Sequence, residues 1–278
     1  MSKTLSRRRY HMWHRTCAMS WVFMFLGFAG AGFAYNVVDV TNGATIKGKV
    51  AFTGTLPHAP RRFEVRNGPE VCGPERMLTK LEVRDGKVKG VVIALEGVDR
   101  GKPFASHHET ATGQGRGAFH YAGGDELNLN VRLEKCSFGP FTGVIRADES
   151  VQFVNHDSIK HTLHTYSLKG RQAKILRTLH TQSLRSQGQT EKDFPAEKLR
   201  RASAVVLTCD RHDFMENWLY MVKNPYYAIS DESGNFEIGQ IPPGDYKLVA
   251  WHPILGMQEH RVTVTSHGGL SVDFDFVK

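Results

Sequence analysis

Three side chains that can bind a soft metal ion lie within seven residues of one another. Cys209, His212 and Met215 follow directly after the apolar run 204–207. A strand that ends in a cysteine, followed by a short loop with histidine and methionine, can wrap one face of a single ion. A thiolate, an imidazole and a weak thioether form the donor set that suits copper in electron-transfer sites.

This donor set lacks a second imidazole, and the stretch 153–161 supplies a candidate. His161 is the expected upstream ligand, with His164 and His156 as alternatives. Because side chains alternate along a strand, His161 and His164 point to opposite faces, so at most one of them faces the site. Cys209 would bind as a thiolate, the two imidazoles through neutral nitrogens, and Met215 weakly along the axis.

Other interpretations of the same residues stay open. Cys209 and His212 match half of a zinc site, although zinc prefers four Cys, His or carboxylate ligands and would leave Met215 unused. The loop could also be a metal-free remnant on a metal-binding fold, because fold does not imply function. For a bound metal, we expect apolar neighbours such as Phe153, Phe214 and Trp218 to exclude water.

The first 34 residues have the order of a secretory signal peptide. Arginines at 7–9 precede the apolar block 21–28, and small residues lead to a cleavage site near Ala34. We therefore expect a periplasmic or secreted protein whose mature chain has no membrane span. An uncleaved anchor is the alternative, and Ser6–Tyr10 also resembles a twin-arginine export signal.

Removal of this leader changes what the charge implies. The whole chain has 36 basic and 28 acidic residues, a net charge of +8. Residues 1–34 hold five of the basic residues and no acidic ones, so the mature chain has a net charge of +3. The high isoelectric point therefore mostly describes the leader, and no nucleic-acid partner is expected.

Three cysteines are left after the leader: Cys72, Cys136 and Cys209. In an oxidising compartment two of them are expected to form a disulfide and one to remain unpaired. If Cys209 binds the metal, the disulfide joins Cys72 and Cys136. Otherwise Cys209 is a free thiol at the end of a buried strand, which is a common place for cysteine.

The remaining sequence predicts an all-β protein built from two sandwiches. A short helix is expected near 172–179 in a basic, polar stretch. Apolar alternation between turn signals predicts strands at 44–52, 88–95, 127–133, 143–146, 150–154, 205–208, 218–222, 235–238, 246–251, 261–265 and 270–276.

The residues after 225 are too few for a self-supporting sandwich. We predict that 38–100 and 225–278 form one discontinuous sandwich, joined through a linker loop at 101–124 to a domain at 125–224. Two consecutive domains with a boundary near residue 224 are the alternative.

Residues 125–224 resemble a cupredoxin. Asn155, Asp157 and His161, after the strand 150–154, match the pattern before the first copper histidine of that family, and the downstream loop has the amicyanin type of spacing. The resemblance implies a Greek-key β-sandwich with copper bound by His161, Cys209, His212 and Met215. Many cupredoxins carry Asn directly after the first copper histidine, where it helps to join the ligand loops; here that residue is Thr162.

Residues 226–252 resemble the carboxypeptidase regulatory-like (transthyretin-like) module, through Gly234, the turn 242–246 and the segment 251–253. The resemblance implies a second, smaller sandwich without the zinc protease site of the peptidase domain. His252 and His260 are therefore expected to be packing or turn features. The combination of the two modules is similar to exported proteins called methylamine-utilisation-like.

The sequence thus predicts an exported mononuclear copper protein that passes single electrons to a redox protein partner and catalyses no substrate turnover. It shows no recognisable Ser-His-acid, phosphate-binding or acidic-pair motif. A non-catalytic interaction module of a larger redox or surface complex is one alternative, and a copper carrier is another.

Overall fold

The computed structural model describes residues 35–57, 60–104, 129–139, 141–146, 149–170 and 174–278. The predicted signal peptide and most of the predicted linker at 101–124 lie outside these residues. Regular structure in the described part is almost entirely strand, which confirms the all-β prediction. A search of the same residues for a helix able to cross a membrane found none.

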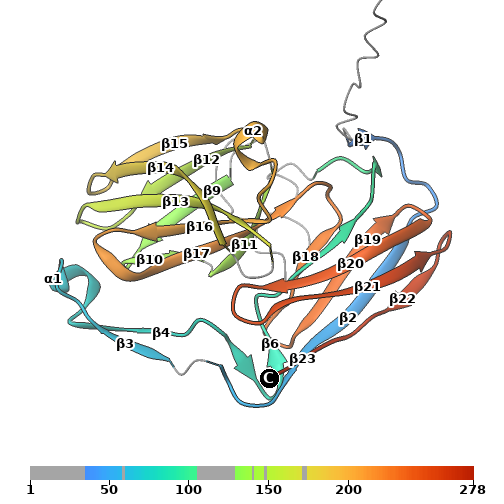
Figure 1. Ribbon diagram of the computed structural model, residues 1–278, viewed down its shortest axis with the longest axis horizontal. Helices are drawn as coiled ribbons and strands as arrows, with labels where there is room; N and C mark the ends of the chain where they lie inside the picture. The colour runs from blue at the N-terminus through green and yellow to red at the C-terminus, as the bar shows by residue number, and fades with distance from the viewer. Residues whose placement is uncertain (1–34, 58–59, 105–128, 140, 147–148, 171–173) are drawn as a thin grey trace, which may run out of the picture. The chain divides into compact units, whose positions relative to one another are not determined.

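The first sandwich holds the predicted metal ligands (Figure 1). Its two sheets enclose one apolar core that includes Phe153, Leu163 and Leu207, each fully buried. The four-stranded sheet has the order β10 (Ser137–Gly139), β9 (Leu129–Glu134), β12 (Glu149–Asn155) and β15 (Gln189–Phe194). The five-stranded sheet has the order β11 (Thr142–Arg146), β17 (His212–Val222), β16 (Ala204–Cys209), β13 (His161–Lys169) and β14 (Lys174–Leu184).

Strand β16 is apolar on both faces because both faces are covered. Val205 and Leu207 point into the core of the first sandwich. Ala204 and Val206 point the other way, into a further apolar cluster that includes Trp251 of the second sandwich. This is why the run 204–207 shows no polar alternation, as expected for a strand buried on both sides.

The second sandwich has its own apolar core, with Ile46, Ile93 and Leu248 fully buried in it. One sheet has the order β18 (Tyr227–Ile229), β7 (Val92–Glu96), β20 (Gly244–His252) and β21 (Gly256–Val264). The other has the order β19 (Asn235–Ile241), β2 (Ala44–Thr53), β6 (Lys87–Val88) and β5 (Val83–Arg84), and β22 (Gly269–Ser271) and β23 (Phe274–Val277) also pair with β2.

Its strands come from residues 44–96 and 227–277. The predicted domain boundaries stay a prediction. A further parallel pair joins β1 (Asn36–Val37) to β8 (Arg100–Gly101).

One part of the predicted range 38–100 belongs elsewhere. The antiparallel pair β3 (Arg61–Glu64) and β4 (Glu75–Leu78), with the one-turn helix α1 (Pro69–Cys72) between them, packs against the first sandwich. Val65 and Cys72 are buried in that core. A disulfide joins Cys72 to Cys136, which lies in the two-residue turn between β9 and β10.

Three details of the predicted elements are wrong. The single strand expected at 270–276 is two strands, β22 and β23. Residues 174–179 are not helical but begin β14, an 11-residue strand along β13, because pairing with a neighbouring strand outweighs local helix propensity. The single strand expected at 88–95 is two strands, β6 and β7, that belong to different sheets. Gly90 lies between them with φ +80°, a conformation that glycine adopts without strain. The second helix, α2, spans Ala196–Leu199.

Candidate metal centre

A tight hairpin with an irregular second strand brings the downstream candidate ligands together. Cys209 at the end of β16 pairs directly with His212 at the start of β17 across a two-residue turn. The next paired residues are Thr208 and Glu216, so residues 213–215 have no partner on β16. This bulge re-aims the side chains of the segment. Met215 is 1% exposed and is buried in the same apolar core as Cys209.

His161 reaches the same place from the neighbouring strand β13. Leu163 of β13 pairs with Cys209, so His161 lies just beyond the end of β16. The backbone N–H of Asp210 donates a hydrogen bond to the carbonyl of Thr162 at 3.0 Å and joins the two ligand segments. The residue that replaces the family's asparagine thus makes this link through its backbone.

Three donor atoms converge between these strands. His161 Nδ1 lies 3.7 Å from Cys209 Sγ, His212 Nδ1 lies 3.5 Å from the same sulfur, and the two nitrogens are 3.2 Å apart. Metal–nitrogen bonds of about 2.0 Å and metal–sulfur bonds of about 2.3 Å, spread roughly trigonally, would set such donors about 3.3–3.8 Å apart. The triangle therefore has the size that one metal ion requires, and its three residues are at most 4% exposed.

The outer nitrogen of His212 fixes the state of its ring. His212 Nε2 lies 2.9 Å from the backbone carbonyl of Asn67, which can only accept a hydrogen bond. Nε2 therefore carries a proton, and in the neutral form of the ring Nδ1 has a free lone pair directed toward Cys209. Ligating histidines usually hold their outer N–H in this way.

His161 is held in the same manner by a different group. Its Nε2 lies 2.9 Å from Asp157 Oδ2, which also accepts the backbone N–H of Cys136 at 2.9 Å. The side chain of Asn155 receives the backbone N–H of Asp157 at 3.0 Å and donates to the carbonyls of Ile159 and Arg185. The carboxylate that orients His161 is thus itself fixed by its loop.

Two imidazole lone pairs therefore face each other at 3.2 Å beside a sulfur atom. Two acceptors at that distance repel unless a cation or a proton lies between them. The thiol of Cys209 can donate its single proton to one of them only. A single cation, in contrast, can accept an electron pair from all three atoms at once.

The pKa values follow the burial of these groups. Burial raises the pKa of the Cys209 thiol, while the backbone N–H groups of Thr162, Arg211 and His212 act in the opposite direction by stabilising the thiolate. Burial also lowers the pKa of His161, against the opposing hydrogen bond to Asp157. His161 is therefore neutral at physiological pH, which is the form that binds metal.

The donor chemistry distinguishes between metals. A zinc site would call for a fourth Cys, His or carboxylate ligand. Asp157 is the carboxylate beside these residues, and it lies on the outer side of the His161 ring, bonded to Nε2 rather than aligned with Nδ1. One sulfur, two imidazoles and a buried thioether nearby match the copper set instead.

The alternative upstream ligands lie elsewhere. His156 is exposed. His164 is on the opposite face of β13, where its Nδ1 is 3.1 Å from Asp210 Oδ1 and its ring stacks on Tyr166. Of the expected water-excluding residues, Phe153 and Phe214 are in the core of the first sandwich, but Trp218 packs in the cluster that faces the second.

Sequence reasoning missed the role of Asn67 and the bond from Asp157 to His161. Asn67 acts through its backbone carbonyl on a residue 145 positions away, and no residue type signals such a contact. Asp157 is four residues before His161, and this spacing was the available signal. Both residues orient imidazoles and contribute no donor to the triangle.

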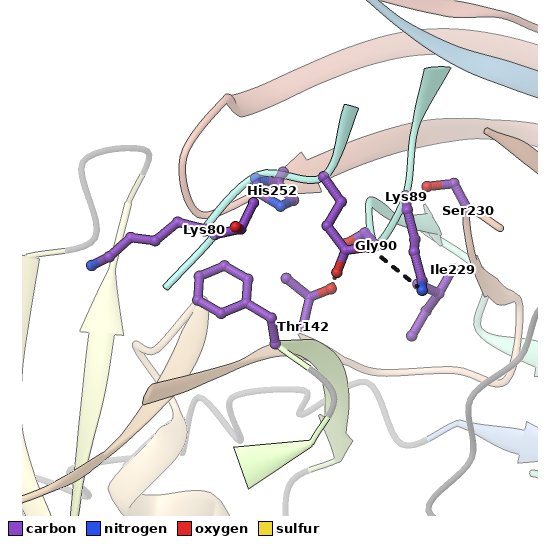
Figure 2. Close-up of a pocket in the computed structure, with 10 residues that line it drawn as sticks. Lys80, Lys89, Gly90, Thr142, Ile229, Ser230 and His252 are labelled. Carbon is purple, nitrogen blue, oxygen red and sulfur yellow. Dashed lines mark hydrogen bonds and ion pairs between the residues drawn. The ribbon is translucent and has the colours of Figure 1, made fainter. Parts of the chain in front are cut away.

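A small cavity lies away from these residues, at the junction of the two sandwiches (Figure 2). Lys89, Thr142, Ser230 and His252 are among its lining residues, and its volume is about 40 Å³, so it holds little more than water. In Figure 2 Lys80 extends away from the other side chains, and its Nζ lies 2.7 Å from Glu216 Oε1.

Part of the chain is similar to solved cupredoxin structures. A reduced Cu(I) form of an amicyanin variant is 15% identical with a TM-score of 0.28, and the match covers 39% of this chain and 95% of amicyanin. A copper-containing nitrite reductase from Thermus scotoductus SA-01 is 18% identical with a TM-score of 0.28, over 36% of this chain and 24% of that protein. At these TM-scores the likeness says nothing about a metal or an activity in this chain.

A family model described as polysaccharide lyase family 4, domain II, a fibronectin type III-like module, matches residues 200–271. The matched range starts in the first sandwich and continues through most of the C-terminal strands of the second. The carboxypeptidase regulatory-like resemblance of 226–252 therefore stays a prediction. No curated protein sequence matches the chain.

Proposed function

We propose that this chain binds one copper ion through His161, Cys209 and His212, with Met215 as a weak fourth ligand, and that it carries single electrons. One observation carries the proposal: two imidazole acceptors and a sulfur converge within 3.7 Å of one another, and the outer nitrogens of both rings are already bonded. A bound cation turns this repulsive arrangement into a set of three bonds.

When bound, copper supplies a one-electron redox couple. The chain itself does the rest. Asp157 and the Asn67 carbonyl hold both rings in the tautomer that presents Nδ1, and backbone N–H groups favour the thiolate of Cys209. Because the ligand segments belong to packed strands, their donor atoms move little between oxidation states.

Burial of the ligands favours electron transfer over copper delivery. His161, Cys209 and His212 are 0%, 4% and 3% exposed, and Met215 is 1% exposed. A carrier has to pass its metal to a partner by ligand exchange, which needs donors that a partner can reach. An electron can leave a buried centre without any exchange of ligands.

We also propose a place and a partner for this function. The Cys72–Cys136 disulfide is what an oxidising compartment produces and supports a periplasmic or secreted location. There the chain would exchange electrons with a redox protein and catalyse no substrate turnover. The second sandwich would stabilise the first or dock to the partner.

Addition of Cu(II) to the purified protein tests the proposal. We expect one equivalent to bind and to give a thiolate-to-copper charge-transfer band in the visible spectrum. Cys209→Ser should remove the band, and the matched variant His252→Asn, which changes a buried histidine of the other sandwich, should keep it. A wild-type protein with a confirmed free Cys209 thiol and no such band would overturn the proposal.

The same variant separates the proposal from a pure interaction module. If the function in cells needs copper, Cys209→Ser has the same phenotype as deletion of the whole chain. If cells with Cys209→Ser behave like wild type while the deletion does not, the chain acts through its surfaces.

A further inference from the structure

The disulfide lies directly behind the candidate metal ligands. Cys72 Sγ is 3.7 Å from His212 Nε2, on the side of the ring that faces away from Cys209. Cys136 and Cys72 are both at most 3% exposed. The disulfide is therefore buried beside the site, unlike a disulfide on the surface. Its two cysteines belong to different groups that hold the histidines of the site.

One end of the disulfide belongs to the segment that holds His212. In this segment, residues 67–72, the Asn67 carbonyl accepts the Nε2 proton of His212, and the Asn67 side chain donates to the carbonyl of Arg211 at 3.1 Å. The backbone N–H groups of Val71 and Cys72 both donate to the carbonyl of Gly68. The turn that follows Asn67 thus connects its carbonyl rigidly to Cys72.

The other end belongs to the group that holds His161. The backbone N–H of Cys136 donates to Asp157 Oδ2, and the same oxygen accepts the Nε2 proton of His161. Cys136 itself has φ +53°, an unfavourable conformation for a residue with a side chain, so its position depends on the surrounding contacts. The disulfide is one of these contacts.

The segment 67–72 lies in the loop between β3 and β4, and Val71 packs against the core of the first sandwich. It lies outside both sheets of the first sandwich, and α1 is a single helical turn. It closely approaches the loop before His161: a Cβ added to Gly68, at φ +68°, would lie 2.7 Å from Ile159 Cδ1. A glycine at this place therefore allows the segment to pack against the ligand loop.

We propose that Asn67, Asp157 and the Cys72–Cys136 disulfide form one positioning unit, which fixes both imidazoles so that metal retention depends on the oxidised disulfide. The part of this inference that concerns metal retention rests on the proposed copper function. The inference adds a role for residues outside the ligand set. Loss of groups that orient metal ligands typically costs 10–100-fold in metal affinity. The disulfide acts on both rings, so we expect an effect within that range from its loss alone.

The double variant Cys72→Ser/Cys136→Ser tests the proposal, with Glu70→Ala as the matched control. Glu70 is an exposed residue of the same helical turn. In the copper-loaded proteins, we expect a chelator to remove copper from the double variant at least about 10-fold faster than from wild type or the control. The charge-transfer band should also shift, because the two rings are less firmly oriented.

A second measurement uses the metal-free proteins and stays informative if copper does not bind. Nuclear magnetic resonance of ¹⁵N-labelled protein detects the Nε2 protons of His161 and His212. We expect slow exchange with water for both in wild type and in Glu70→Ala, and fast exchange for both in the double variant. If the wild-type protein takes up no copper, the proposed function is wrong. The exchange rates of these protons would still test the positioning unit.

A double variant with wild-type proton exchange and a wild-type copper release rate would overturn the inference. If the double variant does not fold, Gly68→Ala replaces it, because an alanine at φ +68° is strained and presses on Ile159 Cδ1, which disturbs the segment while the disulfide stays. We then expect fast exchange of the His212 proton with slow exchange of the His161 proton. Unchanged exchange of both protons in this variant would count against the role of Asn67.

Discussion

The two sandwiches bury imidazoles in different ways. In the first, His161 and His212 each bond an outer acceptor and direct the free Nδ1 toward Cys209. In the second, His252 is 2% exposed, and its Nδ1 accepts a hydrogen bond from the backbone N–H of Ile254 at 3.2 Å. The lone pair of His252 is therefore used locally. The direction of the lone pair, rather than burial, therefore distinguishes the two histidines that could hold a metal from His252.

The largest expected effect comes from truncating either apolar core. Phe153 in the first core and Phe274 in the second are at most 1% exposed. Each change to alanine should lower the free energy of unfolding by about 3–5 kcal/mol. We expect Phe153→Ala alone to accelerate copper release as well. Denaturant unfolding combined with copper titration checks this, and equal loss of copper retention in both variants would contradict the separation of roles.

Copper should stabilise the first sandwich by mass action. At a free concentration one hundred times the dissociation constant, a ligand bound only by the folded state adds about 2.7 kcal/mol to the free energy of unfolding. Thermal unfolding with and without Cu(II) measures this gain, and Cys209→Ser should show none of it. The same gain in Cys209→Ser would place the bound copper on other histidines.

The second sandwich should respond to acid through His252. Burial, and then the nearby charge of Lys278, lowers the pKa of His252 to about 3. The lining of the adjacent cavity adds Lys80, Glu82 and Lys89 as charged neighbours. The unfolded chain binds this proton below the ordinary histidine pKa of about 6.5, and the folded chain does not until about pH 3.

The contribution of neutral His252 to the free energy of unfolding is therefore fully present above about pH 6.5. It is lost as the pH falls from there toward about 3, at up to about 1.4 kcal/mol per pH unit. His252→Asn keeps an acceptor for the Ile254 N–H and removes the titration. Denaturant unfolding from pH 7 to pH 4 should give a flatter profile for this variant. Identical slopes for the two proteins would show that His252 takes up its proton equally in the folded and the unfolded state.

The smallest expected effect concerns an exposed ion pair network of the second sandwich. Lys247 Nζ lies 2.7 Å from Glu96 and 3.2 Å from Glu259, and all three side chains are about two-fifths exposed. Lys247→Met should lower the free energy of unfolding by less than about 1 kcal/mol. The difference should shrink further at high salt, and copper release should not change. A larger loss would mean that these charges are coupled more strongly than exposed pairs usually are.

The sequence is informative where the chemistry is local. The spacing of Cys209, His212 and Met215 predicts a strand followed by a short loop, and the structure brings Cys209 and His212 together in this way. His212 and Met215, however, lie on strand β17, which begins after a two-residue turn rather than at residue 218. The histidine pattern 156–164 predicts His161 through its family resemblance, and the structure brings its Nδ1 to Cys209.

Long-range contacts could not be predicted in the same way. The Asn67 carbonyl meets His212 only after β3, α1 and β4 have folded onto the first sandwich, and any residue type has a carbonyl. The expected helix at 172–179 failed for a related reason. Its residues mix apolar and basic side chains, which suits an exposed helix as well as a strand, but the neighbouring strand β13 offers hydrogen-bonding groups that only the folded sheet provides.

Strand β2 has a consequence for the order in which the chain can fold. It pairs with β19, and its remaining partners include β22 and β23, the last strands of the chain. During synthesis, β2 emerges early and waits for β19, β22 and β23, of which the last two pair with it across more than two hundred residues. The first sandwich takes all strands of its two sheets from residues 129–222 and can be complete before that. A released chain that ends near residue 225 should thus hold a protease-resistant first sandwich beside an open N-terminal strand, which is the state most exposed to aggregation.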